Sequence, residues 1–282
     1  MNVGIVGLGA VGGSLGLDLR AKGHWVLGAS RQAATCQHAL ACGAADRAST
    51  DLSALAAAEL VFVCTPLAAL APTVAALAPH LEPSTIVTDV GSVKAAILEA
   101  VAPLWPNFVG GHPMAGTAES GLAAARAGLF AGAPYALTPT ESTPPASCRQ
   151  VAALAESLGS QVLHCSPQAH DHAVAWISHL PVMVSAALLQ ACASERDATV
   201  QPLAQTLASS GFRDTSRVGA GNPELGVMMA RYNRQALLAS LQQYRRSLDA
   251  LIACIEREEW QALERWLQSA QAISSAFDSR GG

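Results

Sequence analysis

Three glycines lie in the stretch Gly7-Leu8-Gly9-Ala10-Val11-Gly12, directly after an apolar run at residues 2–6 and before a helical pattern at residues 12–23. Between a strand and a helix, the first glycine allows a tight turn, the second allows close backbone approach to a ligand, and the third allows tight helix–strand packing. The amides at the helix start favour negative charge. The stretch therefore predicts a dinucleotide-binding turn formed by Gly7, Gly9, Ala10, Val11 and Gly12, with a purely structural glycine turn as the alternative.

The first half of the chain alternates short apolar runs with alanine-rich helical patterns. Such alternation is typical of a parallel sheet covered by helices on both faces. Together with the glycine turn, it predicts a doubly wound Rossmann domain. The expected strands are residues 2–6, 25–28, 60–64, 85–88, 107–110, 135–137 and 161–164.

The second half has helical patterns and no convincing strand. Ser166 and Pro167 are typical of a helix start, with Ser as the N-cap and Pro in the first position. We therefore expect a Rossmann domain at residues 1–165, followed by an all-α domain at residues 166–282. The expected helices cover residues 170–194, 201–209, 223–248 and 258–276.

The composition bears on the partners. Only 13% of the residues are charged and 51% are hydrophobic, whereas soluble domains carry roughly 25% charge. A large apolar interface with a second copy is therefore expected. The net charge of −4 and the lack of a basic run argue against nucleic acid.

We expect no membrane partner and a cytoplasmic location. The most apolar segment, residues 174–193, contains His179, Pro181 and Gln190 and is interpreted as a buried helix. No signal peptide is visible. The seven cysteines include no Cys-x-x-Cys pair, which indicates reduced thiols.

The residues after the second expected strand bear on the choice of cofactor. NAD enzymes usually carry an acid there to bind the ribose, but this chain has Ser30 and Arg31 and no carboxylate until Asp46. A hydroxyl and a guanidinium suit a phosphate, which favours NADP, unless Arg31 is only a solvated surface residue. Further loops at the same edge of the sheet offer Thr65, Pro66 and Ser92 to the nicotinamide half.

His112 stands between two glycines and a proline, where a side chain is rigidly held. Oxidation of an alcohol requires a base, and neutral imidazole suits that task, so His112 is the candidate. In the loop before it, we interpret Asp89 as a loop cap and Lys94 as a surface charge. We expect no metal, because His170 and His172 would point about 200° apart on a helix, and solvated or capping roles are favoured for them.

Five pieces of the chain, in the same order, resemble the arogenate/prephenate dehydrogenases: GLGAVGGSL (7–15), TDVGSVK (88–94), GGHPMAGT (110–117), SHLP (178–181) and SSGFRDTSR (209–217). The resemblance spans essentially the whole chain, and the last two pieces are specific to that family. It implies a Rossmann domain followed by a helical domain that forms a homodimer. It also implies oxidative decarboxylation of a cyclohexadiene, giving tyrosine from arogenate or 4-hydroxyphenylpyruvate from prephenate.

The resemblance also implies roles for individual residues. His112 would be the base, Ser92 would orient His112 or the substrate hydroxyl, and Arg217 would clamp a carboxylate. Arg213 would lie at the pocket mouth unless it is a surface cation. His179 would have a pocket or interface role, or be a core histidine. Asp171 would hold Arg217 or His179, or act as a charge at a helix start.

Two departures from prephenate-using relatives favour arogenate. Val182 stands where a second histidine is common, and Ala118 precedes Glu119 where an acid is common. Prephenate remains the second candidate substrate. Two rival functions are a β-hydroxyacid or imine reductase, although no lysine follows residue 94, and a non-catalytic NADP sensor. We expect kcat/KM to fall near pH 6.5, roughly the usual pKa of imidazole, and tyrosine to inhibit competitively.

Overall fold

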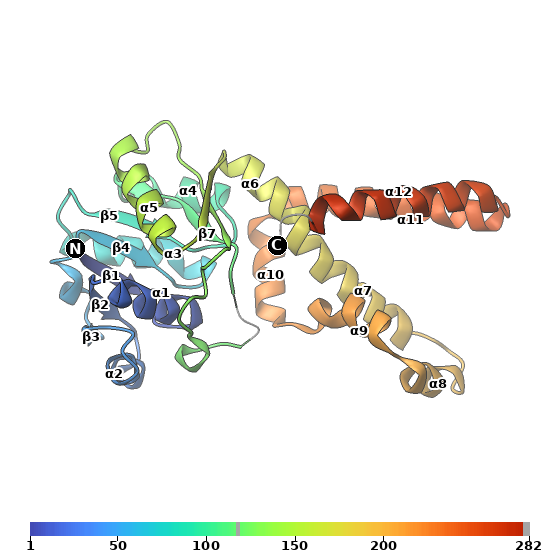
Figure 1. The fold of residues 1–282 in the computed structure, drawn as a ribbon, viewed down its shortest axis with the longest axis horizontal. Coiled ribbons are helices and arrows are strands. Elements are labelled where there is room, and N and C mark those ends of the chain that lie inside the picture. The colour runs from blue at the N-terminus through green and yellow to red at the C-terminus, as the bar shows by residue number, and fades with distance from the viewer. Residues whose placement is uncertain (117–118, 279–282) are drawn as a thin grey trace. The chain divides into compact units, whose positions relative to one another are not determined.

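The computed structural model describes residues 1–116 and 119–278 and separates into two compact units, Met1–Arg234 and Gln235–Gly282. Thr117, which belongs to the family resemblance, and Ala118, one of the departures that favour arogenate, lie outside the described residues. The first unit contains a parallel sheet, a small second sheet and several helices, and the second unit is a pair of helices (Figure 1).

The main sheet has six parallel strands in the order β3-β2-β1-β4-β5-β6, which is the Rossmann order. The strands are β1 (Asn2–Val6), β2 (Trp25–Ala29), β3 (Arg47–Ser49), β4 (Leu60–Val63), β5 (Ile86–Asp89) and β6 (Phe108–Val109). The predicted parallel sheet is confirmed. Only the three-residue β3 has no counterpart among the expected strands of this sheet.

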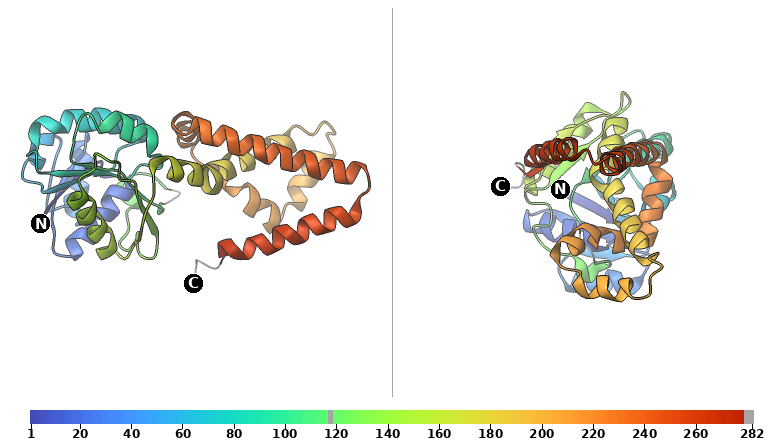
Figure 2. Two further views of the ribbon diagram at one scale, coloured as in Figure 1. Left: turned by 90° about the horizontal axis from the view of Figure 1, so that it is seen from above. Right: turned by 90° about the vertical axis from the view of Figure 1, so that its right-hand side faces the viewer.

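Alternate residues of the strands pack into two separate hydrophobic cores, one on each face of the sheet. Ile5 and Phe62 pack in the core on the side of α1 (Ala10–Ala21) and α5 (Pro145–Ser157). Val6 and Val63 pack in the other core, with α3 (Leu67–Leu77) and α4 (Ala95–Val101). Because successive side chains of a strand point to opposite faces, the sheet is covered by helices on both sides, as Figure 2 shows in its left view. The remaining helix of this part is α2 (Ala33–Ala41).

Two of the expected strands lie in a different sheet. β8 (Pro134–Leu137) and β9 (Gln161–His164) form a three-stranded sheet with β7 (Gly111–Pro113), in the order β7-β8-β9. β7 runs antiparallel to β8, and His112 lies opposite Ala136. The sequence pattern predicted the strands but not this separate pairing, because a three-residue strand such as β7 has too few positions for a recognisable alternation.

The helices of the first unit after β9 are α6 (Pro167–Val174), a π-helical turn η4 (Ala175–His179), α7 (Leu180–Ala193), α8 (Val200–Leu207), α9 (Ser210–Ser216) and α10 (Pro223–Tyr232), with a 3₁₀ turn η5 (Arg217–Ala220) before α10. Ser166 caps α6 by accepting a hydrogen bond from the Ala169 amide at 3.2 Å, which confirms the predicted helix start.

The stretch Pro167–Ala193 is long and apolar enough to cross a membrane, by length and composition only. Within this chain, 28% of its most apolar window is buried. Within one chain the predicted burial of residues 174–193 is partial, and the buried residues are Val174, Ala175, His179, Leu180 and Ser185. α7 contacts α9 and η5 on one side, and most of its remaining side chains stay half-buried or exposed.

The expected single helix over residues 223–248 is broken. Asn233 has a non-helical backbone, with φ −115° and ψ 36°, and ends α10. The second unit begins just after this break and contains α11 (Arg234–Glu256) and α12 (Trp260–Asp278). These two helices run in opposite directions (Figure 2), and they expose apolar side chains that include Ile252, Ile255, Trp266 and Ile273.

Candidate active site

The predicted cofactor residues gather at the carboxyl edge of the main sheet. Gly7 follows β1, Ser30 and Arg31 follow β2, Thr65 and Pro66 follow β4, and Ser92 follows β5. Parallel strands place the loops after their carboxyl ends along one crevice, which is where open α/β sheets bind ligands.

The glycine turn has the geometry needed to approach a phosphate. Gly7 has φ +95°, and a Cβ at Gly12 would lie 2.1 Å from the Gly7 carbonyl oxygen. A Cβ at Gly9, in contrast, would meet no atom within 4 Å. Gly9 is the N-cap of α1 and has no side chain to occupy the first amides of that helix. The turn therefore leaves open space in front of free helix-terminal amides, where a pyrophosphate fits.

The second strand ends without an available acid. Ser30 is half-buried and Arg31 is exposed. The first carboxylate after the strand, Asp46, is engaged elsewhere, because it accepts from Arg20 Nε at 2.9 Å and from the Val26 amide at 2.8 Å. At β4, the Thr65 hydroxyl is buried and has no hydrogen-bond partner among the described residues.

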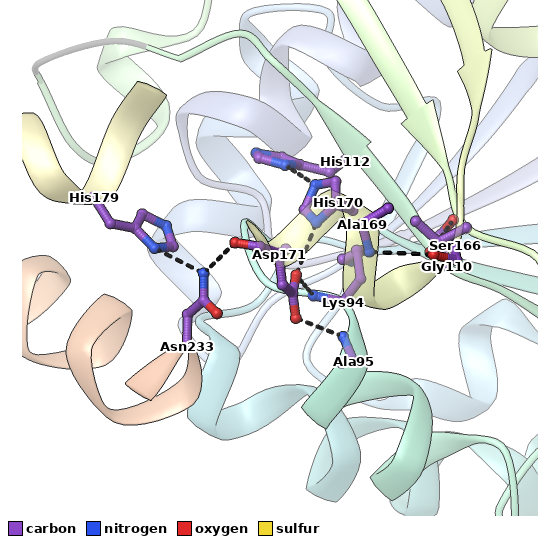
Figure 3. Close-up of polar contacts among 12 residues, drawn as sticks. Lys94, Ala95, Gly110, His112, Ser166, Ala169, His170, Asp171, His179 and Asn233 are labelled. Atoms are coloured by element: carbon purple, nitrogen blue, oxygen red, sulfur yellow. Dashed lines mark hydrogen bonds and ion pairs between the residues drawn. The ribbon is translucent and has the colours of Figure 1, made fainter. Parts of the chain in front are cut away.

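His112 lies in β7 and is 9% exposed. Its Nδ1 lies 2.8 Å from Nε2 of His170, and Nδ1 of His170 lies 2.8 Å from Oδ1 of Asp171 (Figure 3). Burial, followed by the charges of Lys94, His170 and His179, lowers the pKa of His112 well below its usual 6.5. His112 is thus held as a neutral imidazole, the form that a general base requires.

The sequence interpretation of His170 as solvated or capping is wrong. His170 is 4% exposed and joins His112 to Asp171, whereas His172 is exposed as expected. A residue 58 positions from His112 gave no local signal of this contact. The groups of three or more His, Cys, Asp or Glu side chains that a metal would require do not occur among the described residues.

Asp171 acts as a charge at a helix start, as its alternative role predicted, but at the start of α4 rather than of its own helix α6. Its carboxylate accepts from the Lys94 amide at 2.8 Å and from the Ala95 amide at 2.9 Å, so it caps the N-terminus of α4. Within the described part of the chain, its carboxylate makes no bond to Arg217 or His179. The expectation that it holds one of those residues is therefore wrong, since its two oxygens are committed to α4 and His170.

Lys94 was expected at the surface but is fully buried. Its ammonium is paired with the Asp89 carboxylate and donates to the Gly111 carbonyl at 2.7 Å. Asp89 also accepts from the Gly91 and Gly111 amides at 2.8 and 3.1 Å, so it is more than a loop cap. Burial lowers the pKa of Lys94, and Asp89 opposes that shift.

His179 is fully buried in η4. The Asn233 amide donates to the Asp171 carbonyl at 2.7 Å and approaches Nδ1 of His179 at 3.2 Å. Nδ1 is then the acceptor and Nε2 carries the hydrogen, which has no partner among the described residues. Asn233 was not foreseen, because it lies inside what the sequence pattern predicts as one helix.

Ser92 is half-buried and makes no hydrogen bond to His112, so His170 orients this imidazole instead. Arg217 opens η5 and is exposed, without a hydrogen bond or ion pair to any residue that the structure describes. Arg213 is also exposed, with one long hydrogen bond to the Ala208 carbonyl at 3.4 Å.

Comparison with known proteins decides the family. Residues 15–164 match the model "Prephenate dehydrogenase, nucleotide-binding domain", and residues 166–269 match "Prephenate dehydrogenase, dimerization domain". The chain belongs to the prephenate dehydrogenase family. This membership confirms the resemblance and favours it over a reductase or a non-catalytic sensor.

Three relatives show how far the likeness of this dehydrogenase extends. The crystal structure of Synechocystis arogenate dehydrogenase is 54% identical, covers 98% of this chain and 100% of its own, and has a TM-score of 0.91. A prephenate dehydrogenase from A. aeolicus, solved with hydroxyphenyl propionate and NAD+, is 27% identical over 98% of both chains, with a TM-score of 0.92. The Zymomonas mobilis cyclohexadienyl dehydrogenase is 31% identical, over 96% of this chain and 94% of its own.

Proposed function

We propose that this family member is an NADP-dependent arogenate dehydrogenase that forms tyrosine by oxidative decarboxylation. The observation that carries the chemistry is the buried, neutral His112 whose Nδ1 is engaged by His170 at 2.8 Å. Only Nε2 of His112 is left to accept the proton of a ring hydroxyl. The bound nicotinamide supplies the hydride acceptor, and loss of carbon dioxide makes the ring aromatic.

Arogenate is favoured over prephenate by two observations. The 54% identical relative is named an arogenate dehydrogenase, and Val182 places an uncharged side chain where prephenate-using relatives often have a histidine. A missing cationic group near the substrate side chain suits an amino acid, whose ammonium a cation would repel. Prephenate is the second candidate, because relatives such as those from A. aeolicus and Bacillus subtilis carry that name.

The preference for NADP rests on Ser30 and Arg31. Both follow β2, where the 2′-phosphate of NADP would lie, and Asp46 is held by Arg20 and the β2 backbone. A ribose-binding acid is therefore missing from this loop. Gly7, Gly9, Ala10, Val11 and Gly12 would hold the pyrophosphate, and Thr65, Pro66 and Ser92 would line the nicotinamide half.

Substrate binding is assigned to Arg217, Arg213 and His179. The exposed Arg217 guanidinium can take a carboxylate in two parallel hydrogen bonds. Arg213 would lie at the mouth of the pocket, and His179 offers the hydrogen on Nε2, which is unpaired among the described residues. Ser92 remains a candidate to bind the reacting hydroxyl directly.

We further propose a cytoplasmic homodimer, with the helical domain at residues 166–282 providing the interface and the Rossmann domain at residues 1–165. Support comes from the half-exposed α7 and from apolar residues on α8, α11 and α12, which include Leu203, Leu207, Ile255 and Phe277. Light scattering after size exclusion tests the dimer. A monomer of 28.9 kDa would contradict it.

A two-by-two assay tests the reaction, with arogenate or prephenate and NADP or NAD, following the absorbance of the reduced nicotinamide. Turnover with arogenate and NADP well above that with each remaining pair is expected. Equal or better turnover of prephenate would overturn the substrate assignment. His112→Ala should abolish turnover and still bind NADP, which separates loss of the base from loss of the fold.

A further inference from the structure

Three buried side chains form a continuous chain that begins at the proposed base. His112, His170 and Asp171 are 9%, 4% and 5% exposed. The two bonds between them are 2.8 Å each, and the imidazole rings meet edge to face with centroids 5.0 Å apart (Figure 3). Nothing in a simple base mechanism requires a second imidazole and a carboxylate behind the first.

The carboxylate end determines where the hydrogens lie. Asp171 accepts from two backbone amides of the α4 start, at 2.8 and 2.9 Å, and therefore acts as an acceptor only. Its bond to His170 requires a hydrogen on Nδ1 of His170. A neutral imidazole has one such hydrogen, so Nε2 of His170 is an acceptor and Nδ1 of His112 is the donor. Nε2 of His112 is then left with a free lone pair, as a base requires.

We propose that His170 is a positioning residue that also accepts a proton from His112 during turnover. The inference rests on the proposed function, in which His112 Nε2 takes the hydroxyl proton of the substrate. As the new N–H bond forms at Nε2, the Nδ1–H bond of His112 breaks and its proton passes to Nε2 of His170. His112 is then neutral again, and the positive charge is on His170, paired with Asp171. After product release the proton returns along the same bond and leaves from His112 Nε2 to water.

The surrounding charges favour this shift. Burial, followed by the charge of Lys94 and then those of His170 and His179, makes a cation at His112 unfavourable and lowers its pKa. The carboxylate of Asp89 is already paired with Lys94. Asp171 is the carboxylate that contacts an imidazole here, and it contacts His170. A cation is therefore better placed on His170 than on His112.

The kinetic test compares His170→Ala with His170→Gln, using the full-length enzyme with arogenate and NADP. The glutamine carbonyl can accept from His112 Nδ1 and orient it, but it cannot hold a proton. We expect kcat to fall by roughly 10²–10⁴-fold in the alanine variant and to stay at least about tenfold low in the glutamine variant, with KM close to wild type in both. His172→Gln, on the exposed side of the same helix, is the matched control and should retain wild-type kinetics.

The outcomes separate the two roles. Wild-type kcat in the glutamine variant would show that His170 only orients His112 and would overturn proton acceptance. Wild-type kcat in both variants would overturn the proposal entirely. If the wild-type enzyme does not turn over arogenate, the proposed function fails instead.

A second measurement does not depend on activity or on the folding of a variant. Nitrogen NMR of wild-type protein with ¹⁵N-labelled histidine reports which ring nitrogen carries hydrogen. Nδ1–H on both His112 and His170 is expected in the neutral resting enzyme. An Nε2–H tautomer on His112 would overturn the proposal even if the kinetics agreed with it.

Discussion

The ammonium of Lys94 donates to the carbonyl of Gly111 at 2.7 Å, one residue before His112. On the other side of the same residue, Asp89 accepts from the Gly111 amide at 3.1 Å. A buried ion pair from the β5–α4 segment thus holds both polar groups of one peptide residue in β7. The position of the His112 backbone depends on this pair.

Replacing Lys94 with Met should therefore damage both stability and catalysis. The change leaves Asp89 charged, buried and unpaired, and breaking such a pair costs roughly 3–5 kcal/mol. Urea unfolding measures the loss, and kcat with arogenate should fall with it. Lys22→Met is the matched control, because Lys22 is the other lysine of the sequence and is exposed.

A double-mutant cycle with Asp89→Asn sharpens this test. The double variant should lose clearly less stability than the sum of the two single losses, because neither partner is then left as an isolated buried charge. Additive losses would mean that Lys94 and Asp89 act independently, contrary to their contact.

The acid limb of the pH profile should lie well below 6.5. Burial and then Lys94 lower the pKa of His112 from 6.5, and the base works only when it is neutral. kcat/KM should therefore stay level as the pH falls through about 6.5 and decline only as the pH passes the lowered pKa. The sequence alone predicted a fall of kcat/KM near pH 6.5, the pKa of an ordinary imidazole, and the burial of His112 corrects that prediction. A limb centred on the ordinary imidazole value in the wild-type enzyme would contradict it.

Acid should also destabilise the fold through His179. Burial lowers its pKa to about 4. As the pH falls, the unfolded chain therefore binds a proton near pH 6.5, whereas the folded chain binds it only near pH 4. Between those values the unfolded state binds more protons, and the free energy of unfolding must fall as the pH falls. Thermal unfolding across this interval should show a declining Tm, and His179→Gln should show a shallower decline.

Gly9→Ala and Gly12→Ala should separate cofactor binding from folding. A Cβ at Gly12 would lie 2.1 Å from the Gly7 carbonyl oxygen, so this variant should lose about 1–3 kcal/mol of stability or more, as overpacking does. A Cβ at Gly9 meets nothing within 4 Å, so this variant should keep the wild-type Tm. Fluorescence titration should nonetheless show weaker NADP binding in Gly9→Ala, and unchanged binding there would argue against a pyrophosphate at this turn.

Arg31→Ala should weaken NADP binding and leave NAD binding unchanged. A hydrogen bond to a charged group contributes about 1.5–3 kcal/mol, which corresponds to a rise of roughly ten- to a hundredfold in KM for NADP. Arg47→Ala is the control, because Arg47 is exposed at the amino end of β3, away from the predicted crevice. An equal effect on the binding of both cofactors would contradict the assignment of Arg31 to the 2′-phosphate of NADP.

The Rossmann sheet could be predicted well from the sequence because its signals are local. Val6 and Gly7 mark the end of the strand and the start of the turn, and most of the later strands are short apolar runs. The burial of Lys94 and His170 could not be predicted, because the segments that cover them, around Gly111 and His112, are distant in the chain. Polar residues near helix starts are usually solvated, and only the three-dimensional fold shows that these two are buried.

The helix break at Asn233 could not be predicted from the sequence either. Its neighbours continue a helical pattern, so the pattern alone predicts one helix through this position. The amide is instead used to join the Asp171 carbonyl to His179, and the backbone leaves the helical region. A tertiary contact outweighs local helical preference here, and one sequence cannot reveal that competition.

The π turn at Ala175–His179 lies between the helix that carries His170 and Asp171 and the helix that packs on α9 and η5. A π turn holds one more residue than an α turn, and each residue advances an α-helix by about 100°. The π turn therefore accommodates one extra residue within a single turn. This sets the rotation of α7 relative to α6, so that the two helices face different neighbours. Forcing all five residues of this turn into regular α-helical geometry would twist α7 by about 100° relative to α6. Either the histidine chain or the packing on η5 would then have to be given up.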